Sequence, residues 1–376
     1  MTELTGGPRP LRVGLVGAGR IVELTHLPLL CSRQDVTVAG LFDTNVERAE
    51  QMAARFGAEN VCATPEELFE LDLDAALVAC PNYKHAEVTV AALQAGINVL
   101  CEKPMATGAD EARAMIDAAD RNGRELMIAF ANRFRPEVIA LRKAIEDGAL
   151  GEIRSVRCGW LRRSGVPGLN SWFTSKRKAA GGVLIDLGSH LVDLALWLTG
   201  NPRPLSVQCV TEYATGHASE ASWYRPTDGP AADSCDVEIG ATGFAVMEGP
   251  VNIFIEVSWD CAVPYDQTYL HLMGTRGSAR IDTLFGLSPS GHRPAHPLRI
   301  WEGGSGKSRE VAGSEDLLAP YRDQWSFFID GLRNGRGLRA SLSDSLATVE
   351  LIEAMYQSAS SLPPGAGAPP GGQGRL

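Results

Sequence analysis

Long apolar runs and an excess of positive charge are both missing from this chain of 376 residues. No apolar run approaches the ~18 residues that a membrane-spanning helix needs. The opening stretch, MTELTGGPRPLRVG, has no apolar signal core ahead of the first expected strand. The formal net charge is −10, which argues against general nucleic-acid binding because phosphate backbones attract a basic surface. We therefore expect a cytoplasmic protein that binds neither membranes nor nucleic acid.

Cysteine pairs and metal-ligand spacings are also absent from the sequence. None of the cysteines forms a C-x-x-C pair, and several lie in expected strands, where cysteine behaves as a small apolar residue. Free thiols in a reducing compartment fit this pattern better than a disulfide framework. The histidines are scattered without the spacing of metal ligands, so no metal site is expected. The eight cysteines stand at positions 31, 62, 80, 101, 158, 209, 235 and 261.

Strand-like and helix-like segments alternate through the N-terminal third of the chain, which predicts βαβ units and a parallel sheet. We expect an α/β fold whose first domain, residues 1–131, is a doubly wound Rossmann domain. The expected strands are LRVGLV (11–16), VTVAGLFD (36–43), a brief strand at Asn60–Cys62, DAALVAC (74–80), INVLCEK (97–103) and RELMIAF (124–130).

The pattern changes after residue 131. A helix, a long strand (EIRSVRCGWLR) and a second helix (residues 181–199) precede several strands that no helix separates. Such a run suggests a large, open and mainly antiparallel sheet. Two helices, DQWSFFIDGLRNG and SDSLATVELIEAMYQSA, close a second α/β domain over residues 132–360. The Pro/Gly-rich tail, residues 361–376, is expected to be disordered.

Gly17 and Gly19 lie between the first strand and a helix. Glycine at this place lets the backbone approach a pyrophosphate, whose charge the helix N-terminus favours. Arg20 and Ile21 follow in the same loop and are included in the predicted cofactor site. The third fingerprint position is Val22 instead of Gly or Ala, so the helix should lie slightly farther from the strand.

Asp43 ends the second expected strand, about 24 residues after Gly19, near the spacing at which an acidic residue binds the ribose 2′-hydroxyl of NAD. Its carboxylate would repel the 2′-phosphate of NADP. The alternative interpretation is an acid on a surface turn. The context favours NAD as the cofactor, with NADP less favoured.

Glu102, Lys103 and Pro104 end the strand 97–103, at the edge of the sheet where open α/β folds bind ligands. Proline disfavours a helical conformation at the preceding residue, so Lys103 should project from an extended backbone. A lysine at a strand end is by itself more often a solvated side chain.

The segment GGVLIDLGSHLVD, residues 181–193, carries polar groups on one face of an apolar helix. Asp186 and His190 are i, i+4 neighbours and point the same way, and Asp193 follows on that face. Gly188 in the helix interior costs roughly 1 kcal/mol relative to alanine. That cost is reasonable if nicotinamide or substrate must come close.

These two motifs, in this order behind a Rossmann start, resemble the Gfo/Idh/MocA family of NAD(P)-dependent oxidoreductases over about residues 11 to 360. The resemblance implies a C-terminal α/β domain whose sheet packs in homodimers or homotetramers, and a Lys103–Pro104 peptide that is typically cis. Asn82 matches a family position beside the cofactor, and His85 a histidine with a structural role. The predicted cofactor-binding residues are thus Gly17, Gly19, Arg20, Ile21, Asp43, Asn82, Glu102 and Lys103.

The implied reaction is oxidation of a secondary alcohol, which needs a base for the hydroxyl proton. His190 suits that role at neutral pH, and Lys103 would stabilise the developing alkoxide charge on the same oxygen. The two roles can also be exchanged or shared. Asp186 would position the sugar or keep the lysine charged, whereas Asp193, which the family motif does not require, would be structural. A buried polar network is the alternative for the triad.

Flanking segments are expected to shape the substrate pocket. Asn132 and Arg133 match a family segment bordering the site, and Arg163 and Trp172 precede the glycine pair. Each could equally be a residue that packs the domain. The basic run at 176–178 could bind a phosphate of a nucleotide-sugar, although a solvated loop is favoured.

The resemblance therefore implies an NAD-dependent dehydrogenase acting on a sugar, aminosugar or cyclitol, and the composition hints at secondary metabolism. The family also suggests NAD-dependent glycoside cleavage and hydride transfer between sugars. A non-catalytic dinucleotide sensor would be expected to lose the lysine or the histidine, yet Lys103, Asp186 and His190 are all present. All versions of this hypothesis need the amine and the imidazole to meet over the nicotinamide.

Overall fold

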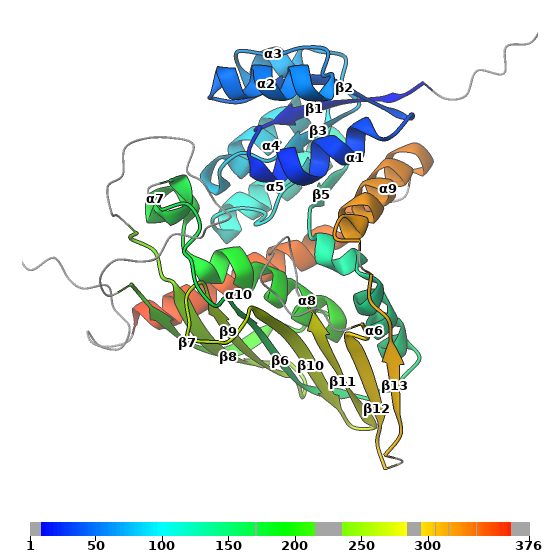
Figure 1. Ribbon diagram of the computed structural model, residues 1–376, viewed down its shortest axis with the longest axis vertical. Helices are drawn as coiled ribbons and strands as arrows, with labels where there is room; N and C mark the ends of the chain where they lie inside the picture. Colours follow the sequence, from blue (N-terminus) through cyan, green and yellow to red (C-terminus); the bar gives the residue numbers. More distant parts are fainter. Residues whose placement is uncertain are drawn as a thin grey trace, which may run out of the picture. The chain divides into compact units, whose positions relative to one another are not determined.

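The computed structural model describes residues 9–169, 171–214, 235–283, 295–304, 306–314, 316–335 and 337–361 (Figure 1). The chain forms two compact units. The first comprises Met1–Ala106, Asp110–Ala129 and Tyr321–Leu342, and the second comprises Thr107–Ala109, Phe130–Pro320 and Ser343–Leu376. Apart from Ser361, the tail for which disorder is expected lies outside the described residues.

A parallel five-stranded sheet, in the order β2-β1-β3-β4-β5, forms the centre of the first unit. This arrangement confirms the expected doubly wound domain. The brief strand expected at residues 60–62 is reduced to one isolated bridge between Leu41 and Val61. The strands are β1 (Leu11–Val16), β2 (Val36–Phe42), β3 (Ala75–Val78), β4 (Asn98–Cys101) and β5 (Leu126–Ile128).

The two ends of helix α2 (Val46–Phe56) in the first unit follow from local chemistry. The helix is capped by the Asn45 side chain, which accepts a hydrogen bond from the Arg48 amide, and it ends at Gly57 in the left-handed conformation. The other helical segments are η1 (Val22–His26), α1 (Leu27–Cys31), α3 (Pro65–Phe69), η2 (Asn82–Lys84), α4 (His85–Gln94), α5 (Ala109–Asn122) and η6 (Leu338–Ser341).

Helix α9 (Ala319–Asn334) belongs to the first unit from Tyr321 onward, although the sequence places this segment in the second domain. Trp325 and Phe328 are fully buried on its apolar face. Arg333 adds a hydrogen bond of 2.9 Å from its Nη1 to the Asp35 carboxylate, just before β2. These contacts join segments about 300 residues apart, which is why local sequence patterns do not reveal them.

The second unit contains an eight-stranded sheet in the order β13-β12-β11-β10-β6-β9-β8-β7. Neighbouring strands are antiparallel except for β6 and β9, so the mainly antiparallel sheet is confirmed. The strands are β6 (Ile153–Leu161), β7 (Pro204–Glu212), β8 (Gly240–Met247), β9 (Asn252–Ser258), β10 (Gln267–Gly274), β11 (Gly277–Thr283), β12 (Leu298–Glu302) and β13 (Ser308–Val311).

Helices α6 (Pro136–Glu146), α8 (Ser189–Thr199) and α10 (Leu342–Ser360) of the second unit pack against one face of this sheet (Figure 1). The alternation of buried and part-exposed residues in β9 shows the reason, because Ile253, Ile255 and Val257 point into the core beneath the helices. The helical segments are η3 (Ala131–Phe134), α6 (Pro136–Glu146), η4 (Trp172–Thr174), α7 (Lys176–Ala179), η5 (Leu184–Gly188), α8 (Ser189–Thr199) and α10 (Leu342–Ser360).

One helical stretch among the described residues, Lys176–Thr199, is long and apolar enough to cross a membrane by length and composition alone. Its most apolar window is 83% buried inside the protein, as in the core helix of a folded domain. The apolar character of this stretch is thus accounted for by packing on the sheet.

Candidate functional site

The turn after β1 requires one of its two glycines and leaves open space at the other. Gly17 has a φ of 105°, and a Cβ atom there would lie 2.4 Å from the Ala79 carbonyl oxygen, so only glycine fits. A Cβ atom at Gly19 would meet no heavy atom of the described chain within 4 Å. The open space at Gly19 would allow a pyrophosphate to approach the backbone closely.

Asp43 is attached to this turn by hydrogen bonds to the backbone. Its Oδ2 accepts from the Ala18 amide at 2.7 Å and its Oδ1 accepts from the Asn45 amide at 2.8 Å. The carboxylate is therefore held beside the glycine turn in one orientation, with lone pairs remaining for a ribose hydroxyl. An unattached acid on a surface turn, the alternative interpretation, does not describe this geometry.

The segment that follows the turn is π-helical. Val22 is fully buried and begins η1, in which the Leu27 amide donates to the Val22 carbonyl. Single π-helical turns frequently occur at functional sites. Arg20 is exposed and Ile21 is half-buried at the start of the segment, so both lie on the accessible side of the turn.

The end of β4 carries the Glu-Lys-Pro motif, and its Lys103–Pro104 peptide is cis. His85, which is buried, lies 2.7 Å from the Pro104 carbonyl through Nδ1 and 2.9 Å from the Cys80 carbonyl through Nε2. Burial lowers the pKa of His85, although both carbonyls and the charge of Glu102 act in the opposite direction. The imidazole thus connects the ends of two strands, which agrees with the structural role implied for it. Asn82 is buried nearby in η2.

In the second unit, Asp186 and His190 are the part-exposed positions of an otherwise buried stretch from Gly181 to Leu196. Trp259 donates its indole Nε1–H to Asp186 Oδ2 at 3.1 Å. The His190 ring stacks at a tilt on Trp160, with ring centroids 5.7 Å apart. Two aromatic side chains therefore hold the acid and the imidazole that the sequence singles out.

The glycines of this motif have a different explanation from the expected one. A Cβ atom at Gly182 would lie 2.0 Å from the Glu238 carbonyl oxygen, and one at Gly181 would lie 2.0 Å from the Tyr356 hydroxyl. At Gly188 the nearest atom to a Cβ would be Leu184 Cδ1 at 2.9 Å. The expectation that nicotinamide or substrate approaches Gly188 is therefore wrong, because this glycine faces the apolar core.

Glu238 supports the helix that carries the candidate site residues, and the sequence pattern does not single it out. Its buried carboxylate accepts hydrogen bonds from the Gly182 amide at 2.9 Å, the Leu184 amide at 3.0 Å and the Tyr356 hydroxyl at 2.7 Å. Burial raises the pKa of Glu238, and these donors partly oppose the rise. The acid holds the start of the helix that presents Asp186.

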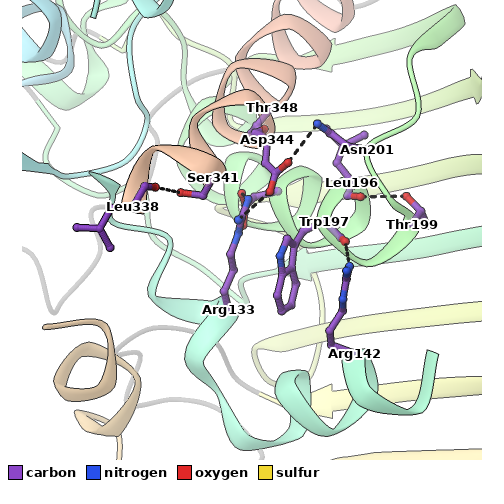
Figure 2. Close-up of polar contacts among 11 residues, drawn as sticks. Arg133, Arg142, Leu196, Trp197, Thr199, Asn201, Leu338, Ser341, Asp344 and Thr348 are labelled. Carbon is purple, nitrogen blue, oxygen red and sulfur yellow. Dashed lines mark hydrogen bonds and ion pairs between the residues drawn. The ribbon is translucent and has the colours of Figure 1, made fainter. Parts of the chain in front are cut away.

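Arg133 is held in an ion-pair network of the second unit (Figure 2). Its guanidinium donates to both Asp193 oxygens at 2.9 and 2.6 Å and to Asp344 at 3.2 Å. Asn201 also donates to Asp344, so the two side chains meet at one carboxylate. These contacts explain Arg133 as a residue that packs the domain, and they give Asp193 the structural role expected of it.

The remaining predicted substrate residues lie in different environments. Arg163 is exposed, whereas its neighbour Arg162 is buried over the Trp160 ring. Strand alternation from Trp160 indicates this difference, because residues two apart share a face. Burial lowers the pKa of Arg162, and the charge of Asp186 acts in the opposite direction. Asn132 is buried in η3, and Trp172 is half-buried in η4 with its ring 5.0 Å from Phe173.

Lys103 belongs to the first unit and His190 to the second, so their predicted convergence stays a prediction. All eight cysteines are free thiols. Within the described ranges, no group of three or more histidine, cysteine, aspartate or glutamate side chains could hold a metal ion.

Comparisons with known proteins identify the family that this chain resembles along most of its length. The Gfo/Idh/MocA oxidoreductase model with an NAD-binding Rossmann fold matches residues 11–130, and the family's C-terminal domain matches residues 138–280. The chain is 33% identical to the "Putative UDP-kanosamine synthase oxidoreductase subunit" of Amycolatopsis mediterranei, over 93% of this chain and 96% of the relative. It is 30% identical to D-glucoside 3-dehydrogenase of Escherichia coli, over 93% of this chain and 95% of the relative.

A solved structure of another protein has the same fold as this chain. GenD2 from gentamicin A biosynthesis, in complex with NAD, has a TM-score of 0.76 and 25% identity, and the match covers 96% of this chain and 97% of that protein. The NAD-binding domain predicted from the glycine turn is thereby confirmed.

Proposed function

The chain belongs to the Gfo/Idh/MocA family of NAD-binding oxidoreductases, and we propose that it transfers hydride between nicotinamide and a secondary hydroxyl of a sugar, aminosugar or cyclitol. The observation that carries this proposal is the pair Asp186 and His190, which stay accessible on an otherwise buried helix and are held by Trp259 and Trp160. The names of the two similar proteins, which refer to UDP-kanosamine synthase and a glucoside dehydrogenase, support a carbohydrate substrate.

Bound NAD would supply the acceptor or donor of hydride. The backbone at Gly17 and Gly19, with Arg20 and Ile21, would hold its pyrophosphate, and Asp43 would bind the ribose hydroxyls and favour NAD over NADP. The remaining predicted cofactor contacts are Asn82, Glu102 and Lys103.

His190 would take the proton of the substrate hydroxyl while Lys103 hydrogen-bonds the same oxygen and stabilises its developing negative charge. The two side chains can share or exchange these roles. Asp186, already an acceptor for Trp259, would accept a hydrogen bond from a neighbouring substrate hydroxyl and so orient the ring. Asn132, Arg163 and Trp172 remain candidates for substrate contacts.

We also propose that the outer face of the eight-stranded sheet forms a homodimer or homotetramer interface. Phe244 and Val246 are exposed on β8, and the strand register aligns Val210 of β7 on the same face. Exposed apolar groups gathered on one sheet face favour association.

The free cysteines support a reducing, cytoplasmic location for the enzyme.

The test is to incubate the protein with NAD and a panel of free sugars, aminosugars, inositols and nucleotide-sugars, and to follow NADH by absorbance. Lys103→Ala and His190→Ala should abolish turnover while NAD binding by calorimetry survives. The matched controls Lys143→Ala and His296→Ala change exposed residues of the same types and should leave turnover unchanged. Silence of the wild type across the panel, or near-normal turnover in either site variant, would contradict the proposal.

A further inference from the structure

A continuous chain of hydrogen bonds runs through the first unit from α9 to the Glu-Lys-Pro motif. Trp325 Nε1 donates to His26 Nδ1 at 2.9 Å, and His26 Nε2 lies 2.9 Å from Glu102 Oε1. Glu102 Oε2 then accepts from the Lys103 backbone amide at 3.1 Å. Trp325 and His26 are fully buried. The proposed hydride-transfer mechanism above makes no use of either residue.

The chemistry of these groups leaves one arrangement of protons. An indole N–H can only donate, so His26 Nδ1 must be the acceptor and carries no proton. The imidazole is therefore neutral with its proton on Nε2, which donates to Glu102. Glu102 accepts at both oxygens and is ionised. Burial acts to raise the pKa of Glu102, but the hydrogen bonds from His26 and from the Lys103 amide, together with the Lys103 charge, oppose burial, and the pKa is lowered.

Aromatic rings surround the hydrogen-bond chain at His26, and charged groups lie at its other end, near Glu102. The Tyr321 and Trp325 rings meet the His26 ring edge-on at centroid distances of 6.2 and 5.8 Å. The charged and titratable groups that act on Glu102 besides His26 are Lys103 and His85. In such apolar surroundings a misdirected polar group is costly, so the imidazole is held in a single tautomer.

We propose that Trp325 and His26 are positioning residues for Lys103: they hold the Glu102 carboxylate in one orientation, and that carboxylate fixes the backbone amide from which the lysine projects. The inference rests on the proposed function for its kinetic consequence, but its structural part can be measured without turnover. A phenylalanine in place of Trp325 would also fill space, but α9 would then have no hydrogen bond to His26 and through it to Glu102.

The decisive variant is Trp325→Phe, which keeps an aromatic ring and removes the N–H. Nitrogen NMR of histidine-labelled protein should show His26 as the neutral Nε2–H tautomer in the wild type and as a mixture of tautomers in the variant. Amide exchange at Lys103 should become roughly threefold to tenfold faster, as expected for the loss of one hydrogen bond. With a sugar from the panel, kcat should fall by a similar factor while the KM for NAD stays unchanged.

Two comparisons separate positioning from packing. Phe328→Leu disturbs the ring beside Trp325 (centroids 5.9 Å apart) without touching the hydrogen bonds, so it should lower the unfolding midpoint and leave the tautomer and Lys103 exchange unchanged. His26→Gln keeps a donor near the place of Nε2 and should retain most of kcat, whereas His26→Leu should lose it.

The outcomes are distinguishable. Equal effects of Phe328→Leu and Trp325→Phe on Lys103 exchange, or a wild-type His26 that is not the Nε2–H tautomer, would overturn the positioning role. Faster exchange with an unchanged kcat would overturn its kinetic part. If the wild type used no member of the panel, the proposed function would fail, and Lys103 exchange would still decide the coupling.

Discussion

Trp259, fully buried directly after β9, donates its indole N–H to Asp186 in the π-helical segment η5 at 3.1 Å. The bond joins the sheet to the helix that carries His190. Because Trp259 can only donate, Asp186 must be an acceptor on that side. Arg162 directly follows β6, which pairs with β9; burial lowers the pKa of Arg162, and the Asp186 carboxylate acts to raise it. Asp186 is thus a carboxylate held in place before any substrate arrives.

Trp259→Phe should weaken catalysis without weakening NAD binding. The variant loses a hydrogen bond to a charged group, worth about 1.5–3 kcal/mol, which corresponds to roughly a ten- to hundredfold fall in kcat/KM for the sugar. Steady-state kinetics and NAD calorimetry measure the two effects. Phe173→Leu, which alters a ring 5.8 Å from Trp259 but not the bond, is the control. A similar kinetic loss in that control would assign the effect to packing.

Arg133→Met should destabilise the protein strongly, because it leaves the buried Asp193 carboxylate without its main partner. Loss of one member of a buried ion pair costs about 3–5 kcal/mol. Burial already raises the pKa of Asp193 despite Arg133. Adding Asp193→Asn should recover part of the loss, as a double-mutant cycle in denaturant would show. Arg121→Met, which breaks an exposed pair with Asp117, should change little. Equal effects of the two arginine variants would exclude the buried network as the cause.

Asp43→Asn should reduce the preference for NAD. The variant removes the charge that would repel a 2′-phosphate and weakens acceptance from a ribose hydroxyl, a bond worth about 1.5–3 kcal/mol. Calorimetric titration should show NAD binding weakened roughly ten- to hundredfold and NADP binding weakened less. Glu47→Gln, an exposed change in the first turn of α2, is the control. Parallel losses for both dinucleotides would indicate a damaged turn and would contradict the proposed ribose contact.

Tyr356→Phe should destabilise the protein more at neutral than at acid pH. The hydroxyl donates to Glu238, whose pKa is raised by burial above its ordinary value of 4.5. A raised pKa in the folded state means stability that is present below 4.5 and is lost as the pH rises through the folded pKa. Removing the donor raises that pKa further, so the deficit grows once Glu238 ionises, to about 1.5–3 kcal/mol.

Chemical denaturation of the wild type and of Tyr356→Phe at neutral pH and at acid pH measures the loss in free energy of unfolding. Tyr265→Phe, at a tyrosine that is exposed, should show none. A deficit in Tyr356→Phe that is independent of pH would mean that Glu238 stays protonated throughout.

Local patterns along the chain are enough to predict the features that depend on neighbouring residues. Alternation of strands and helices predicts the parallel sheet, and the caps at Asn45 and Gly57 bound α2, because these features depend on local backbone and side-chain chemistry. The glycine turn with Asp43, and the Asp186–His190 stripe, follow from spacing alone. Strand periodicity would also have favoured Arg162 over Arg163 as the buried arginine.

Contacts between groups that are far apart along the chain become visible in the folded protein alone. Trp325 finds His26, Arg133 finds Asp193 and Asp344, and Glu238 finds the start of the motif helix. The core contact at Gly188 belongs to the same class. A buried donor must find an acceptor and a buried charge a partner, but sequence spacing does not say which one. That choice is made when packing brings together segments that are far apart along the chain.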